Sequence, residues 1–294
     1  MLSAMGSTNC FSYLSSPDVI IEDDMLYRSL WQIGSSCTGV DSAVQFRLRI
    51  NQKGSWQSWN HTVNSNLAQG PSAGNPKVYN LFFNPIVTGS DDDRVVMSFD
   101  IMSFDWFDDM SSWLYLEEVI VMKTAISSSD EILRYEFTGS SDGWTYQGQI
   151  PSYDEPLTSD LAGNLGLMPD GSSNCFSYWF SPDVTIEAGM IYRTRFTVGS
   201  TSTEPDQSIQ TRLRINQKGA WQGWDRIVNS NKQQAPSATE MKTYDVFFMP
   251  IVTGSGDNLA VFSFDIMSFD WFDNLYSWIY LDTCTQDEIS FSPF

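Results

Sequence analysis

The sequence predicts an all-β protein built from two antiparallel β-sandwiches in series, with little helix. Three observations lead to this prediction. Aromatic residues make up 14% of the 294 residues, short apolar runs are separated by Ser, Thr, Asn and Gly, and the chain repeats itself. Strands and turns have this composition. The length fits about two domains of roughly 150 residues, each able to bury a full apolar core.

The internal repeat is the strongest signal. The sequence matches itself at an offset of 165 residues, from about Leu2 to Leu116, with roughly three positions in five identical. The match pairs 10–13 with 175–178, 47–54 with 212–219, and 99–108 with 264–273. We therefore expect one sandwich over residues 1–129 and a second over 130–294, joined by a strand near Ser127 to Ile132.

The elements of the repeat have the pattern of strands. Arg47 to Asn51 alternates with a period of two, which puts Leu48 and Ile50 on a core face and Arg47, Arg49 and Asn51 on the opposite face. Asn-Gln-Lys-Gly at 51–54 then predicts a hairpin turn. Further predicted strands cover 19–21, 26–28, 78–83, 95–101 and 113–121. No window shows a helical period over three turns.

The second repeat has a leading segment, 132–165, that the first repeat lacks, and its residues 133–137 predict a first strand. Two interpretations stay open. The chain is an excerpt from a longer array, or the first repeat has an open sheet edge that accepts the C-terminal strand of another molecule. In the second case Ile289, Phe291 and Phe294 form the assembly strand of a head-to-tail homopolymer.

The charge balance limits the partners. Thirty-six acidic and sixteen basic residues give a net charge of −20, which repels nucleic acid and anionic membranes. No stretch approaches the ~20 apolar residues of a membrane span, and the first thirty residues lack a signal-peptide pattern. We expect no membrane insertion and an extracellular or cell-surface protein whose targeting segment was removed or belongs to a longer precursor. The acidic surface suits cations or neutral polar ligands, or is a solvated coat.

The four cysteines are Cys10, Cys37, Cys175 and Cys284, without a CxxC or Cys/His cluster that would bind zinc. Only Cys10 and Cys175 occupy matching repeat positions, so the duplication did not carry one disulfide along. Free buried thiols and disulfides both stay open.

Catalysis is not expected, because the single histidine, His61, corresponds to Arg226 in the second repeat. Asp100 and Asp105 are an odd number of residues apart, so in a regular strand they face opposite sides, whereas glycosidase carboxylates must converge. A glycoside-active enzyme is the third and least favoured interpretation.

Aromatic residues beside the predicted turn favour sugar binding. A sugar ring presents an apolar face and a belt of hydroxyls, so its site needs a flat aromatic platform beside amide or guanidinium groups. The alternative is that one Trp of each pair caps the core and the other covers a loop. The predicted carbohydrate-binding residues are Asn51, Trp56, Gln57 and Trp59 in the first repeat and Asn216, Trp221, Gln222 and Trp224 in the second.

From Leu133 to Thr283 the order of features resembles the jelly-roll carbohydrate-binding modules of the galactose-binding-like type. The matching pieces are 135–137 with 143–144, 163–167, 181–184, 192–196 and 278–282. The resemblance implies a jelly-roll sandwich, complete in the second repeat and incomplete in the first, and a structural calcium held by an acid on the first strand and another on the last. Glu136 and Asp282 match those positions in the second repeat, whereas the first repeat has no match for Glu136. The first repeat keeps Glu117 in place of the closing acid.

These observations lead to a non-catalytic extracellular module that binds polysaccharide or a glycosylated surface. The alternative is a structural subunit of an extracellular filament or surface layer, assembled head-to-tail by strand complementation.

Overall fold

The computed structural model describes most of the chain, in segments separated by gaps. The described segments are residues 1–3, 9–38, 45–52, 62–65, 68–69, 71–85, 87, 92–104, 111–138, 140–148, 165–168, 176–203, 210–217, 227–229, 233–234, 238, 240–250, 252, 256–267 and 277–291. Over these residues the protein consists of strands and connections, without a helix, so no helix there is long and apolar enough to cross a membrane. The predicted all-β class is confirmed.

The chain divides into two compact units. Unit 1 contains residues 1–127, 220–228 and 291–294, and unit 2 contains 128–219 and 229–290. Strand β9 (Leu114–Tyr135) begins in unit 1 and ends in unit 2, over the region where a linking strand was predicted.

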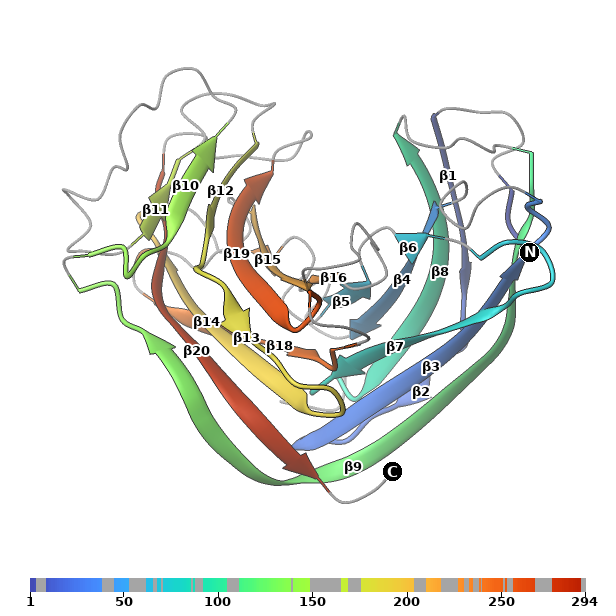
Figure 1. Ribbon diagram of the computed structural model, residues 1–294, viewed down its shortest axis with the longest axis horizontal. Coiled ribbons are helices and arrows are strands. Elements are labelled where there is room, and N and C mark those ends of the chain that lie inside the picture. The colour runs from blue at the N-terminus through green and yellow to red at the C-terminus, as the bar shows by residue number, and fades with distance from the viewer. Residues whose placement is uncertain are drawn as a thin grey trace. The chain divides into compact units, whose positions relative to one another are not determined.

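Unit 1 is a sandwich of two antiparallel sheets (Figure 1). One sheet has the order β1-β8-β4-β5, with β2 on β8 and β6 on β4, and the other has the order β9-β3-β7. Beyond β9, its strands are β1 (Asn9–Ser15), β2 (Val19–Ile20), β3 (Met25–Ser35), β4 (Gln45–Gln52), β5 (Thr62–Ser65), β6 (Ala68–Gln69), β7 (Lys77–Phe83) and β8 (Arg94–Phe104). Each of the successive long strands β3, β4, β7, β8 and β9 lies in the sheet opposite to the one before it, as in a jelly roll.

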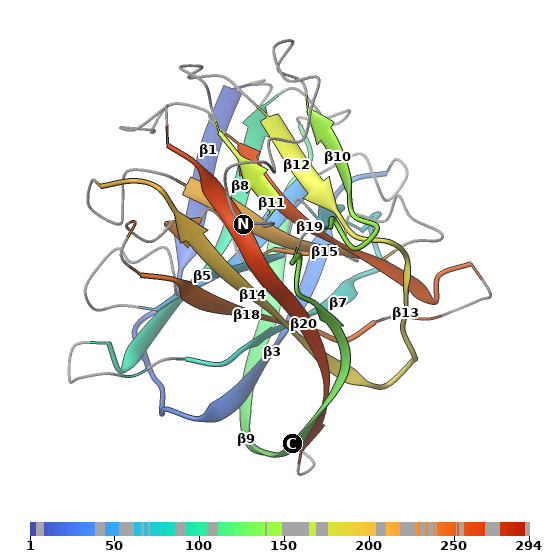
Figure 2. The same ribbon diagram turned by 90° about the vertical axis from the view of Figure 1, so that its left-hand side faces the viewer.

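Unit 2 repeats this arrangement (Figure 2). One sheet has the order β15-β19-β12-β10, with β13 on β19 and β17 on β15, and the other has β18-β14-β20, with β11 on β20. The strands are β10 (Thr145–Gly148), β11 (Leu165–Leu167), β12 (Phe176–Phe180), β13 (Val184–Thr185), β14 (Ile191–Ser200), β15 (Gln210–Gln217), β17 (Gln233–Gln234), β18 (Lys242–Phe248), β19 (Leu259–Met267) and β20 (Ile279–Phe291). Strand β16 (Ile227–Asn229) has its first two residues in unit 1 and its last in unit 2.

The pairing registers of the two units agree at the offset of the sequence repeat. Tyr27 lies opposite Phe83 in unit 1, and Tyr192 lies opposite Phe248 in unit 2. The predicted alternation in β4 is confirmed, because Leu48 and Ile50 are buried in the core of unit 1 while the flanking arginines are partly exposed. Phe46 packs edge-on against Phe99 in this core, and Phe196 packs edge-on against Phe262 in unit 2. Each such buried side chain contributes about 1.5–3 kcal/mol.

A tyrosine ring lies over a glycine in the second sheet of each unit. The register shifts by one residue after Gln32 in unit 1 and after Thr197 in unit 2. Just beyond each shift, the Tyr115 ring covers Gly34 and the Tyr280 ring covers Gly199, so that a Cβ atom at either glycine would overlap the ring. These glycines are required for close approach of the aromatic side chain.

Candidate binding faces

The outer face of the β1-β8-β4 sheet in unit 1 carries a row of polar side chains that the pairing register aligns. Asp100 in β8 lies opposite Tyr13 in β1 and opposite Arg47 in β4. Two residues earlier in β8, Ser98 lies opposite Arg49 in β4. Since alternate residues of a strand point to one face, these side chains point away from the core. We call this set polar face 1, and it consists of Tyr13, Arg47, Arg49, Asn51, Ser98 and Asp100.

A buried carboxylate organises polar face 1. Asp100 Oδ2 accepts from Arg47 Nη2 at 2.8 Å and lies 3.1 Å from Arg49 Nη2. The Asp100 side chain is 0% exposed, whereas the arginine side chains keep 13% and 16%. Arg49 Nε also donates to Ser98 Oγ at 3.2 Å. Two guanidinium groups are therefore oriented by one carboxylate, and Tyr13 beside them is 55% exposed.

Unit 2 has the same face, which we call polar face 2 and which consists of Gln147, Tyr178, Phe180, Arg214, Asn216, Ser263 and Asp265. Arg214 Nη2 lies 3.0 Å from Asp265 Oδ2, and Arg214 Nε donates to Ser263 Oγ at 3.1 Å. The guanidinium carbon of Arg214 lies 5.9 Å from the centroid of the Tyr178 ring, which is within reach of a cation–π contact. The backbone of Arg212 pairs with Asp265, as Arg47 does with Asp100.

The aromatic content differs between the faces. The Tyr178 and Phe180 rings lie 5.8 Å apart and tilted, whereas a serine, Ser15, stands at the position equivalent to Phe180. The Tyr178 hydroxyl also donates to Gln147 Oε1 in β10. Polar face 2 therefore offers a larger aromatic platform than polar face 1.

Partial burial shifts the pKa values on these faces. Desolvation lowers the pKa of Arg49, and the neighbouring charge of Arg47 lowers it further, while Asp100 and Tyr13 raise it. Desolvation raises the pKa of Tyr178, with Arg214 acting in the opposite direction. An arginine of this kind stays protonated, so polar face 1 holds two closely spaced positive charges around one negative charge.

Of the predicted carbohydrate-binding residues, the structure describes Asn51 and Asn216. Both are partly exposed and lie on the polar faces, opposite Val96 and Val261. The other six predictions, Trp56, Gln57, Trp59, Trp221, Gln222 and Trp224, lie outside the described residues. Their role in binding stays a prediction.

The predicted metal ligands lie on strands β9 and β20 or directly beside them. Glu136 is exposed, and its carboxylate lies 3.7 Å from Arg134 Nη1. Asp282 is half-buried, and desolvation raises its pKa. Over the described part of the chain, no three His, Cys, Asp or Glu side chains form a group that could hold a metal ion. The described residues therefore do not form a complete calcium site, and calcium binding stays a prediction.

The predicted assembly strand is largely part of β20. Ile289 is buried and pairs with Ile191 in the sheet of its own unit. Phe291 is the last residue of β20, and Phe294 lies outside the described residues. Donation of this segment to another molecule stays a prediction.

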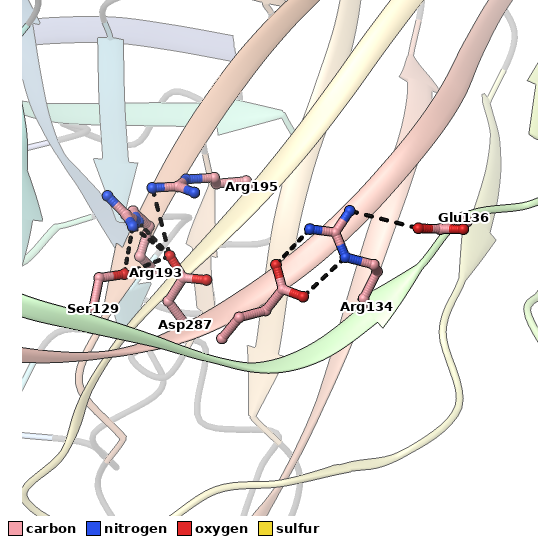
Figure 3. A network of polar contacts seen from close by, with 7 residues as sticks. Ser129, Arg134, Glu136, Arg193, Arg195 and Asp287 are labelled. Carbon is pink, nitrogen blue, oxygen red and sulfur yellow. Dashed lines mark hydrogen bonds and ion pairs between the residues drawn. The ribbon is translucent and has the colours of Figure 1, made fainter.

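A second polar network ties strands together on the other sheet of unit 2 (Figure 3). Asp287 in β20 accepts from Arg193 Nε at 2.9 Å and from Ser129 Oγ at 2.8 Å, and Arg195 lies 3.5 Å away. Burial alone would raise the pKa of Asp287, but these hydrogen bonds and positive charges lower it overall. Because the Asp287 side chain is only 3% exposed, this network serves to hold β9, β14 and β20 in register.

Two of the cysteines are free thiols in the described part of the chain. Cys37 and Cys284 are both buried, and burial raises the pKa of the Cys284 thiol well above its usual value. A buried thiol in apolar surroundings is unreactive. Neither cysteine lies on a polar face.

Sequence reasoning did not identify Tyr13, Asp100 and their equivalents Tyr178 and Asp265 as site residues. The sequence does contain a sign of their role, because Tyr13 and Asp100 lie in the runs that are most alike in the two repeats. Polar residues retained in both copies within otherwise apolar strands point to a shared outer face.

No protein-family model matches the sequence, and no curated protein matches it. Among solved structures, the xylan-binding domain CBM22-1 of Xyn10C from Paenibacillus barcinonensis is 10% identical, with 56% of this chain and 99% of that chain covered and a TM-score of 0.34. The tandem CBM22-1-CBM22-2 domain of the same protein is 8% identical, with 91% and 80% covered and a TM-score of 0.33. The N-terminal cellulose-binding domain of Cellulomonas fimi β-1,4-glucanase C is 18% identical, with 54% and 93% covered and a TM-score of 0.29. At these sequence identities and TM-scores, the similarities do not indicate a function for this chain.

Proposed function

We propose that this protein is a non-catalytic, extracellular carbohydrate-binding protein that takes polysaccharide on its two polar faces. The supporting observation is the combination, in each unit, of a partly exposed tyrosine with hydrogen-bonding groups fixed by ion pairs. The face is already ordered without a ligand, because Asp100 orients Arg47 and Arg49. Such preorganisation reduces the entropy that binding must offset.

The chemistry of the faces suits a sugar. Tyr178 and Phe180 provide an apolar surface for the C–H face of a ring, and Asn216, Ser263 and Arg214 lie on the adjoining strands. Aromatic platforms next to amide and guanidinium donors match the two faces of a sugar ring. A face that extends across three strands accommodates an extended chain better than a small compact molecule.

The test is a glycan array followed by calorimetry with the polysaccharides that bind. The double variant Tyr13→Ala, Tyr178→Ala removes the tyrosine ring from each face and leaves Phe180 on polar face 2. Loss of one aromatic contact costs about 0.5–1.5 kcal/mol, so affinity per face should fall about 2- to 13-fold. Trp113→Ala is the matched control, because Trp113 is 44% exposed and precedes β9 of the other sheet.

The two outcomes separate clearly. A decrease in affinity for the double variant, with unchanged melting temperature and an unaffected Trp113→Ala control, supports the polar faces as the site. If polysaccharide binds and the double variant binds as well as the wild type, the site lies elsewhere. The variants Trp221→Ala and Trp224→Ala would then test the predicted tryptophans.

A second candidate function is assembly by strand addition. It is favoured by the edge of β1, which among the described strands pairs only with β8, whereas its equivalent β12 pairs with β10 as well as β19. An exposed strand edge is a template for another strand. We propose that a C-terminal strand of a second copy would be the donor.

Electron microscopy at rising protein concentration tests this candidate. Truncation after Ser290 keeps Ile289 and Asp287 in their own sheet, so the shortened chain should stay folded. If filaments form with the full chain and disappear on truncation, assembly is supported. Filaments that persist after truncation, or a full chain that stays monomeric, would argue against it.

A further inference from the structure

Polar face 1 carries an excess of positive charge on a chain whose net charge is −20. Arg47 and Arg49 share the single carboxylate of Asp100, so this cluster has a formal charge of +1. The excess is local, because acidic residues outnumber basic ones by more than two to one over the whole chain.

In unit 2 the strand register places equivalent residues in one row. Arg214 Nη2 lies 3.0 Å from Asp265 Oδ2, and Arg212 occupies the register position opposite the same aspartate, as Arg47 does opposite Asp100. Polar face 2 therefore shares the register of polar face 1 and one arginine–aspartate ion pair.

The guanidinium groups of Arg47 and Arg49 have N–H donors that the contacts within polar face 1 do not use. In the described part of the chain, Arg47 uses Nε and Nη2 on Asp100, and Arg49 uses Nε on Ser98 and Nη2 on Asp100. Each guanidinium has five N–H donors, and the Nη1 groups have no polar partner among the described residues. The lowered pKa of Arg49 reflects its burial and its closeness to Arg47, a repulsion that a second anion would relieve.

We propose that the ligand of both faces is an acidic polysaccharide, whose uronate carboxylate binds Arg47 and Arg49 on polar face 1 and Arg214 on polar face 2 while a sugar ring packs on Tyr13 or Tyr178. This inference rests on the proposed function, since it assigns the ligand class of the same faces. A carboxylate is favoured because its two oxygens match the planar fork of a guanidinium group.

The experiment compares matched ligands by calorimetry with the full chain. Oligogalacturonate and its methyl ester have the same backbone and differ in charge, as do glucuronoxylan and its carboxyl-reduced form. For whichever acidic ligand binds, neutralising the carboxylate should lower affinity about tenfold or more, as expected for loss of a charge-assisted hydrogen bond. Raising salt from about 50 to about 500 mM should weaken only the acidic form.

Variants locate the effect. In Arg49→Gln, Arg214→Gln the ratio of affinities for the acidic and the neutral form should fall to about threefold or less. Lys123→Gln, Arg134→Gln is the matched control, because both side chains are exposed on β9 of the other sheet and their loss removes the same two positive charges. Arg49→Lys, Arg214→Lys keeps the charge and should retain part of the preference, which separates charge loss from a folding defect.

Each outcome has one meaning. Equal affinity for acidic and neutral forms overturns the ligand class and leaves polysaccharide binding intact. Preference for the acidic form that survives Arg49→Gln, Arg214→Gln also overturns the assignment to these arginines. If neither form of any polysaccharide binds, the proposed function itself fails.

Discussion

Asp100→Asn tests whether the buried carboxylate of polar face 1 stabilises the fold. The substitution keeps the shape of the side chain but removes the charge that Arg47 and Arg49 share at 2.8 and 3.1 Å. Breaking a buried ion pair costs about 3–5 kcal/mol, because the remaining charges stay partly desolvated. Since the arginine side chains keep some contact with water, we expect a loss of about 2–4 kcal/mol.

Urea unfolding followed by tryptophan fluorescence measures this loss. With a slope of about 2 kcal/mol per molar urea, the midpoint should fall by roughly 1–2 M. Asp18→Asn is the control, because Asp18 and Arg94 form a pair at 3.6 Å with both side chains at least a third exposed, and exposed pairs contribute about 0–1 kcal/mol. If Asp100→Asn lowers the midpoint no more than Asp18→Asn does, the carboxylate does not have the structural role that its burial indicates.

Three further predictions concern the scaffold. Gly199→Ala should lower stability by about 1–3 kcal/mol in thermal unfolding, because its methyl group displaces the Tyr280 ring; an unchanged melting temperature would show that the ring is not held there. Asp287→Asn should lower the free energy of unfolding at pH 7, because the folded-state pKa of Asp287 is lowered and its charged form is stabilised there. The difference in free energy from the wild type should shrink as pH falls below about 4 and vanish once Asp287 is protonated in the folded state. A difference that stays constant down to about pH 2 would contradict this. Cys37 and Cys284 should react with a thiol reagent only after unfolding, and rapid labelling of the native protein at either residue would contradict their burial.

The outer face of β4 could be predicted from the sequence, but its neighbours could not. Alternation over Arg47 to Asn51 is a local pattern, and it correctly separated the core residues from the arginines. Placing Tyr13 and Asp100 in the same row requires the pairing of strands about 35 to 90 residues apart in the sequence. Register between distant strands depends on how the whole core packs, and a single sequence does not contain that information.

The role of Asp100 shows the same difference. In the sequence it was one carboxylate of a possible catalytic pair with Asp105, and only the spacing of the two argued against it. In the structure its surroundings decide its role, because two arginines reach its buried Oδ2 atom. The ion-pair network around Asp287 also joins segments more than 150 residues apart, and no local pattern indicates it.

Since a polar face occurs once in each unit, the proposed function gives the chain two binding sites. A single protein molecule can then link two polysaccharide chains, or it can bind one long chain at two points. Bridging would give turbidity that peaks at a matched ratio of protein to polymer and disappears when either component is in large excess. Binding at one face raises the effective concentration of ligand at the other face only when one ligand molecule reaches both. Avidity should therefore depend on the length of the ligand as well as on the chemistry of each face.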